Sequence, residues 1–113
     1  MEILKTIVKS LNETKLEDLS IYETKERTPF FDYAVIVTAS SSRQLVASVD
    51  KLRKDCEEKG MTIRGVEGLD GGLWVLVDFG TVIVNIFIEE ERERYDLDKL
   101  WRTLPQIDYK SLL

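Results

Sequence analysis

The stretch Glu67–Ile88, EGLDGGLWVLVDFGTVIVNIFI, decides the fold of this chain. It holds two β-type runs, Leu73–Asp78 and Thr81–Ile88, on either side of Phe79 and Gly80. Two apolar runs joined by a short break that contains glycine are typical of a β-hairpin. The stretch therefore predicts an antiparallel hairpin, and the chemistry of its two faces is the first place to look for function.

The predicted hairpin has two unlike faces. A two-residue turn at Phe79-Gly80 pairs Asp78 with Thr81 and gives one wholly apolar face, suited to packing beneath helices, made of Leu73, Val75, Val77, Val82, Val84, Ile86 and Ile88. The other face mixes aromatic, aliphatic and polar side chains: Trp74, Leu76, Asp78, Thr81, Ile83 and Asn85. Exposed apolar patches rimmed by polar groups mark protein interfaces, where tryptophan often dominates the binding energy.

The turn register and the direction of Trp74 stay open at this point. A three-residue loop at residues 78–80 with a bulge would place Thr81 and Asn85 behind the apolar residues. Phenylalanine also disfavours the positive φ of a two-residue turn, but the first register is preferred because it separates the faces cleanly. Patterning favours neither an exposed Trp74 nor one packed under another helix.

The rest of the chain predicts one α/β domain with a mixed sheet of about five strands flanked by helices. A strand that is apolar on both faces, YAVIVTA at residues 33–39, is expected at the centre of the sheet. Hydrophobic spacing predicts helices over 2–12, 42–59 and 89–95, with a further turn reaching Trp101, and strands over 18–23 and 62–66. The strand at 62–66 closes a β–α–β crossover that leaves its strands parallel. We expect the domain to span residues 1–101 and residues 102–113 to form a loosely held tail.

The amino-acid composition argues against several classes of function. The chain has 113 residues, no histidine and a net charge of −5, so it lacks the commonest general base and the basic face of a nucleic-acid binder. An acidic protein is suited to a basic partner. The single cysteine, Cys56, is expected to be a buried, inert thiol. We predict no enzyme activity, no cofactor, no metal, no membrane segment and a cytoplasmic location.

The serine run Ser40–Ser42 precedes the second predicted helix. Helix N-termini bind anions, so the run is a candidate phosphate loop for a residual nucleotide-binding or nucleotidyltransferase-type enzyme. It lacks the known phosphate-loop patterns, however, and Asp70 and Asp78 do not form a DxD pair. The favoured interpretation is a serine-capped helix.

Two segments resemble a known family. Residues 66–101, VEGLDGGLWVLVDFGTVIVNIFIEEERERYDLDKLW, look like the signature of the ribosomal silencing factor family, also called Iojap-like proteins. Residues 30–52, FFDYAVIVTASSSRQLVASVDKL, resemble the same family's segment DYFVIATGTSSRQ, in order and at the right distance. The similarity covers roughly residues 1–101.

The resemblance implies a mixed α/β fold that is nucleotidyltransferase-like without its catalytic site. It also implies binding to ribosomal protein fourteen of the large subunit, which blocks subunit association and represses translation under nutrient limitation. The family's motif WVLLDYGD matches Trp74, Asp78 and Phe79, which the resemblance assigns to the partner contact. Its motif YDLERLW matches a set assigned to structural support: Tyr95, Asp96, Leu97, Leu100 and Trp101.

The chain departs from the family in the hairpin. The family often has a second aspartate where this chain has Thr81, and histidines where it has Asn85 and Ile88. Their absence removes one charge and two imidazoles near the interface, while the Trp74 anchor is kept. The predicted partner-binding residues are therefore Trp74, Asp78, Phe79, Thr81 and Asn85. A homodimer that buries the same face in the free protein is a further possibility.

Overall fold

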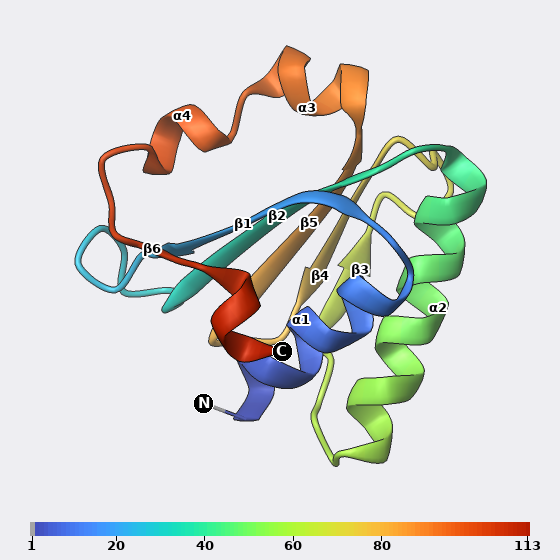
Figure 1. The fold of residues 1–113 in the computed structure, drawn as a ribbon, viewed down its shortest axis with the longest axis horizontal. Coiled ribbons are helices and arrows are strands. Elements are labelled where there is room, and N and C mark those ends of the chain that lie inside the picture. Colours follow the sequence, from blue (N-terminus) through green and yellow to red (C-terminus); the bar gives the residue numbers. More distant parts are fainter. Residues whose placement is uncertain (1) are drawn as a thin grey trace.

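Six strands form one mixed sheet in the order β3-β4-β5-β2-β1-β6 (Figure 1). The computed structural model describes residues 2–113. The strands are β1 (Glu17–Glu23), β2 (Tyr33–Ala39), β3 (Gly65–Glu67), β4 (Trp74–Asp78), β5 (Val82–Ile88) and β6 (Gln106–Ile107). The helices are α1 (Glu2–Glu13), α2 (Ser42–Glu58), α3 (Glu89–Tyr95), α4 (Asp98–Trp101) and a 3-10 helix, η1 (Tyr109–Leu112). The predicted mixed α/β domain is confirmed, with six strands rather than about five.

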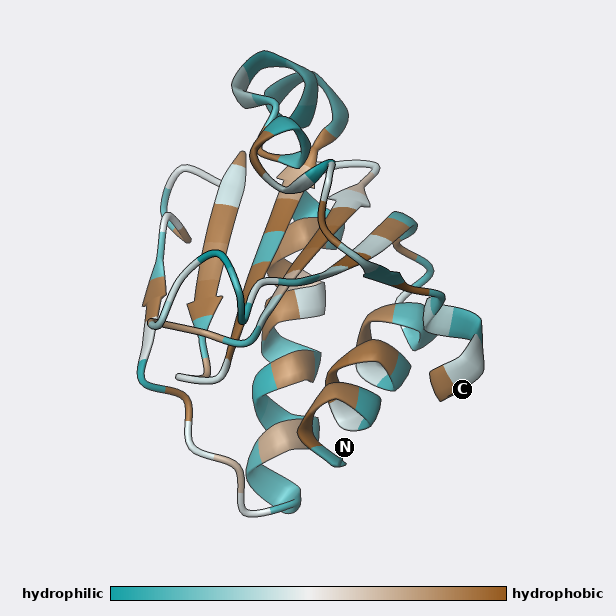
Figure 2. Cartoon of the chain, turned by 90° about the vertical axis from the view of Figure 1, so that its left-hand side faces the viewer, coloured by the Kyte–Doolittle hydropathy of each residue, from teal (hydrophilic) through white to brown (hydrophobic). Residues whose placement is uncertain are grey.

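Helices α1 and α2 cover one face of the sheet, which we call the helix face. Their apolar stripes, with Leu4, Ile7 and Leu11 on α1 and Leu45 and Leu52 on α2, are fully or almost fully buried. Figure 2 shows the hydrophobic residues of both helices and of the central strands. Helical spacing explains this burial, because residues three and four apart lie on one side of a helix.

The sheet is organised around a parallel pair. Strand β2 is buried along its whole length and pairs in parallel with β5, from Tyr33↔Val82 to Ala39↔Ile88. This confirms the predicted central strand. Strand β3 also runs parallel to β2, as the crossover predicted, but it is not its neighbour, since β4 and β5 lie between them. The two sides of β2 are taken by β1 and β5, so the strand after the crossover goes to the edge.

The C-terminal residues differ from the expectation of a loosely held tail. Strand β6 pairs antiparallel with β1 and adds a sixth strand at that edge. Ile107, Tyr109 and Leu112 pack against the main core, and Figure 1 places η1 beside α1. Three apolar side chains spaced along the segment attach it to the domain.

Within residues 2–113, no helix combines the length and the apolar character needed to cross a membrane.

Candidate functional site

The second face of the sheet carries the residues that the sequence selected. We call it the tryptophan face; its residues on β4 and β5 are Trp74, Leu76, Asp78, Ile83, Asn85 and Phe87. In the pairing across the sheet, Glu67, Leu76 and Asn85 form one row, and Trp74 and Phe87 form the next. Because paired residues point to the same side of a sheet, these side chains share a surface.

The hairpin turn lies one residue later than predicted. The chain reverses through Gly80 and Thr81, Phe79 donates its N–H to the Val82 carbonyl oxygen at 2.9 Å, and Asp78 pairs with Ile83. The predicted pairing of Asp78 with Thr81 is therefore wrong. Gly80 has a φ of 86°, a conformation that glycine adopts without strain and phenylalanine does not. The shift moves each partner by two positions, so the division of β4 and β5 into two faces is unchanged.

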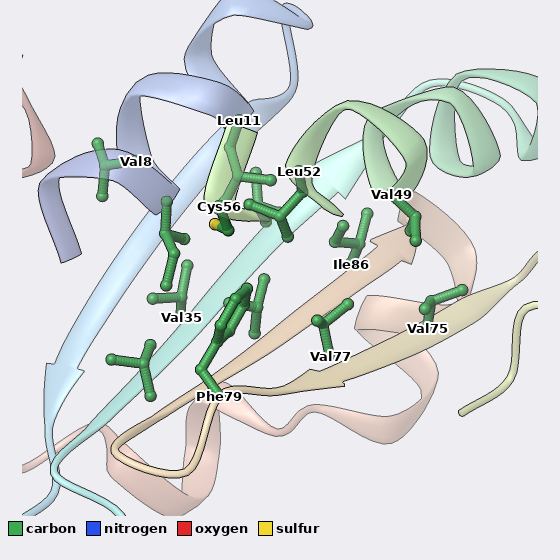
Figure 3. Packing of buried hydrophobic residues seen from close by; sticks show 14 of the residues in the cluster. Val8, Leu11, Val35, Val49, Leu52, Cys56, Val75, Val77, Phe79 and Ile86 are labelled. Carbon is green, nitrogen blue, oxygen red and sulfur yellow. The ribbon is translucent and has the colours of Figure 1, made fainter. Parts of the chain in front are cut away.

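Phe79 lies on the opposite side from Trp74. It is only 6% exposed and belongs to the main core. Figure 3 shows its ring among Val35, Val77 and the other apolar side chains beneath the helices. With the turn placed at Gly80, Phe79 continues the alternation of Val75 and Val77, which explains its direction.

The other predicted residues take different positions around the tryptophan face. Asp78 is half-buried, and its Oδ1 accepts a hydrogen bond from the Gly80 N–H at 2.7 Å, which supports the turn. Thr81 is exposed in the turn itself. Asn85 is only 5% exposed and lies below the surface of the face. The structure thus brings Trp74 and Asn85 together and leaves Thr81 at the end of the hairpin.

Trp74 is half-buried and held by three neighbours. Its Nε1–H donates to Asn85 Oδ1 at 3.0 Å. Its ring stacks on Phe87, with centroids 4.8 Å apart, and contacts Tyr95 of α3 at 4.9 Å. Such aromatic pairs stabilise beyond the area that they bury. Trp74 therefore presents one fixed surface, with part of its indole open to solvent.

Helices α3 and α4 form a strap, residues 89–101, across one end of the tryptophan face. Leu97 and Trp101 pack with Trp74 against a small cluster of Tyr22, Ile36 and Phe87. Figure 1 shows the strap on the side of the sheet opposite α1 and α2. The structural-support role assigned to Leu97 and Trp101 agrees with these contacts. Tyr95 contacts Trp74 but is 51% exposed, and Leu100 is 55% exposed.

Arg92 anchors the strap to the sheet. It donates to both carboxylate oxygens of Asp98, at 3.0 and 3.1 Å, to Thr38 Oγ1 at 3.0 Å, and to Ser20 Oγ and the Asp18 carbonyl oxygen. Tyr22 donates its hydroxyl to Asp98 Oδ1 at 2.6 Å. The local sequence does not indicate this role for Arg92, because Asp18, Ser20 and Thr38 lie more than 50 residues away along the chain. The helical spacing of the segment held no signal for them.

This network shifts two pKa values. Burial, followed by the hydrogen bond to Asp98, raises the pKa of Tyr22 to about 12. Burial alone would raise the pKa of Asp98, but hydrogen bonds from Arg92 and Tyr22 outweigh it and hold that pKa below its usual range. At neutral pH, Asp98 is therefore charged and Tyr22 is a neutral donor.

The open part of the tryptophan face lies beyond the strap. Leu76, Asp78 and Ile83 are each partly exposed, and Leu76 lines a shallow hollow with Trp74, Glu67 and Gly68. The surface is apolar at its centre and carries two carboxylates, those of Glu67 and Asp78, at its border. Such an arrangement suits a protein partner with apolar and basic groups.

The serine run caps a helix, as favoured from the sequence. Ser41 is the N-cap of α2, and its Oγ accepts from the Gln44 N–H at 3.1 Å. Gln44 Oε1 in turn accepts from the hydroxyl of Ser40 at 2.8 Å. Cys56 is buried, and burial raises the pKa of its thiol to about 11, which agrees with an inert cysteine.

Comparison with known proteins assigns the family. Residues 1–113 match the family described as "Ribosomal silencing factor during starvation". The chain belongs to the ribosomal silencing factor family. The ribosomal silencing factor RsfS of Halalkalibacterium halodurans is 30% identical over 112 residues, covering 99% of this chain and 96% of that protein.

The chain is also similar to a solved structure and to a protein that is named as mitochondrial. A crystal structure of a Chromobacterium violaceum protein is 33% identical, with a TM-score of 0.87, and the match covers 92% of this chain and 87% of that one. The mouse protein named for mitochondrial assembly of the large ribosomal subunit is 31% identical over 90% of this chain and 46% of its own length. The likeness of the α/β fold to this solved structure therefore agrees with the family assignment. The likeness to nucleotidyltransferases stays a prediction.

Proposed function

We propose that this protein is a cytoplasmic ribosomal silencing factor that docks its tryptophan face on ribosomal protein fourteen of the large subunit. Docking there blocks association with the small subunit and represses translation under nutrient limitation. The observation that carries the proposal is the fixed, half-open indole of Trp74 beside the partly exposed Leu76 and Ile83. Membership of the ribosomal silencing factor family indicates the ribosome as the partner to test.

The chemistry of the face supports a contact between two proteins. Apolar side chains that are already ordered lose little conformational entropy when a partner covers them. Asp78 and Glu67 place negative charge at the border, in a chain whose net charge is −5, and a ribosomal protein with basic side chains would complement them. A folded protein that stays bound to this site on the large subunit would then block the small subunit sterically.

Truncation of Trp74 tests the proposal directly. We expect Trp74→Ala to weaken binding to purified large subunits by about 2 to 4 kcal/mol, because it removes a central aromatic anchor. Co-sedimentation with large subunits measures the affinity, and a subunit-joining assay measures the loss of anti-association activity. Val46→Ala is the matched control, since Val46 is 36% exposed on α2, away from the tryptophan face.

Two results would contradict the proposal. A folded Trp74→Ala variant that still sediments with large subunits like the parent protein would show that another surface binds. A parent protein that binds large subunits but leaves subunit joining unchanged would remove the silencing mechanism. Sedimentation of the free protein alone checks the predicted homodimer and sets the concentration range for both assays.

A further inference from the structure

Asn85 is a polar side chain where an apolar one would be expected. It lies on β5, between Leu76 of β4 and Ile36 of β2, and is only 5% exposed. A buried amide lowers the stability of a protein unless its polar atoms are hydrogen-bonded. The Oδ1 of Asn85 accepts the Nε1–H of Trp74 at 3.0 Å, so its burial is linked to the indole above it.

The contacts of Trp74 together define the direction of its ring. Phe87 supports it from the adjacent position of β5, with ring planes 24° apart, and Tyr95 contacts it from the strap. Aromatic contacts hold the plane of the indole but do not choose which edge points outward. The hydrogen bond to Asn85 makes that choice, because it keeps the N–H edge inside the protein.

We propose that Asn85 is a positioning residue for the ribosome contact, acting on the partner only through Trp74. This inference rests on the proposed function and reassigns Asn85, which the sequence selected as a direct contact. It also defines the chemistry that the partner supplies. Since the only donor of the indole is used internally, the partner covers a carbon edge of Trp74 with an apolar group and not with a hydrogen-bond acceptor.

Removing the acceptor tests the inference. Asn85→Leu keeps a side chain of similar size but cannot accept the indole N–H, and we expect its affinity for large subunits to fall by about tenfold, because the partner must then order the indole. Asn85→Asp keeps an oxygen acceptor and is expected to restore most of the affinity. In the Trp74→Ala background, Asn85→Leu is expected to have no further effect on affinity.

A measurement on the free protein reports the same interaction without the ribosome. In the parent protein, the indole N–H of Trp74 is expected to exchange slowly with solvent, and Asn85→Leu should accelerate this exchange while circular dichroism stays unchanged. The resonance is assigned by its loss in Trp74→Phe, which separates it from the indole of Trp101. Unchanged exchange in Asn85→Leu would overturn the inference.

The binding results separate this inference from the proposed function. If the parent protein fails to bind large subunits, the proposed function is wrong, and the exchange experiment still decides whether Asn85 fixes the indole. If Trp74→Ala weakens binding but Asn85→Leu does not, the positioning role alone is wrong. If Asn85→Leu weakens binding equally with and without Trp74, Asn85 contacts the partner itself and the inference is overturned.

Discussion

Gly68 lies very close to the backbone of Trp74. It has a φ of 87°, and a Cβ atom placed on it would lie 2.1 Å from the carbonyl oxygen of Trp74. No side chain fits there, because the obstacle is backbone that belongs to strand β4. The position of Trp74 therefore depends on a residue without a side chain as well as on the residues that touch its ring.

Gly68→Ala is expected to destabilise the protein by about 2 to 4 kcal/mol, through the left-handed backbone and the contact with Trp74. Urea denaturation followed by circular dichroism measures the loss. Gly71→Ala is the matched control, since its φ is ordinary and its nearest contact would be at 3.7 Å. Equal stability of the two variants would show that the backbone near Trp74 can shift without lowering the stability of the protein.

Single residues also show what the sequence could predict about the site. Alternation along β4 and β5 correctly separated Trp74 from the valines, and this separation survives the shifted turn because the shift is even. The direction of Phe79 could not be obtained in this way, since it depends on whether glycine takes the first or the second turn position. Alternation also placed Asn85 on the same face as its partner Trp74, but it did not predict that Asn85 would be buried there.

At the scale of elements, the strap illustrates a structure held by long-range polar contacts. Helices α3 and α4 bury no residue completely, and α3 has only seven residues. Isolated helices of this length are not stable in water. Arg92, with its side chain 15% exposed and its hydrogen bonds to Asp98 and Thr38, compensates for the small apolar contact. Charge-assisted hydrogen bonds of this kind are stronger than neutral ones.

Arg92→Leu is expected to lower the free energy of unfolding by about 2 kcal/mol and to loosen the strap, because it leaves the Asp98 carboxylate without its cation. Hydrogen exchange of the backbone amides of residues 89–101 measures the loosening, and thermal unfolding measures the stability. Arg94→Leu is the control on the same helix, since the Arg94 side chain is 72% exposed. Similar exchange in the two variants would mean that apolar contacts alone hold the strap.

At the scale of the whole molecule, the last ten residues complete the sheet. Strand β6 covers the free edge of β1, and η1 packs on α1 and the core. An uncovered sheet edge is a site for unwanted pairing with other chains. The sequence could not predict this role, because a two-residue strand has no periodicity and its partner, β1, lies at the other end of the chain.

Deletion of residues 104–113 is expected to lower stability by an amount on the order of 3 kcal/mol, from the lost burial of Ile107, Tyr109 and Leu112. The truncated protein should also self-associate through the uncovered edge of β1. Thermal unfolding and analytical ultracentrifugation measure the two effects. A truncated protein that melts like the parent and stays monomeric would restore the expectation of a loosely held tail.

The strand order has a consequence for how the protein folds while it is being made. Helices α1 and α2 and the antiparallel pair β1–β2 are complete early, but the other side of β2 waits for residues 82–88. Pairings between distant segments form slowly and leave apolar surface open in the meantime. The edge of β1 that does not pair with β2 is covered later still, by residues 106–107. The sheet therefore becomes complete only after residues 106–107, the last of its strands in chain order, have been made.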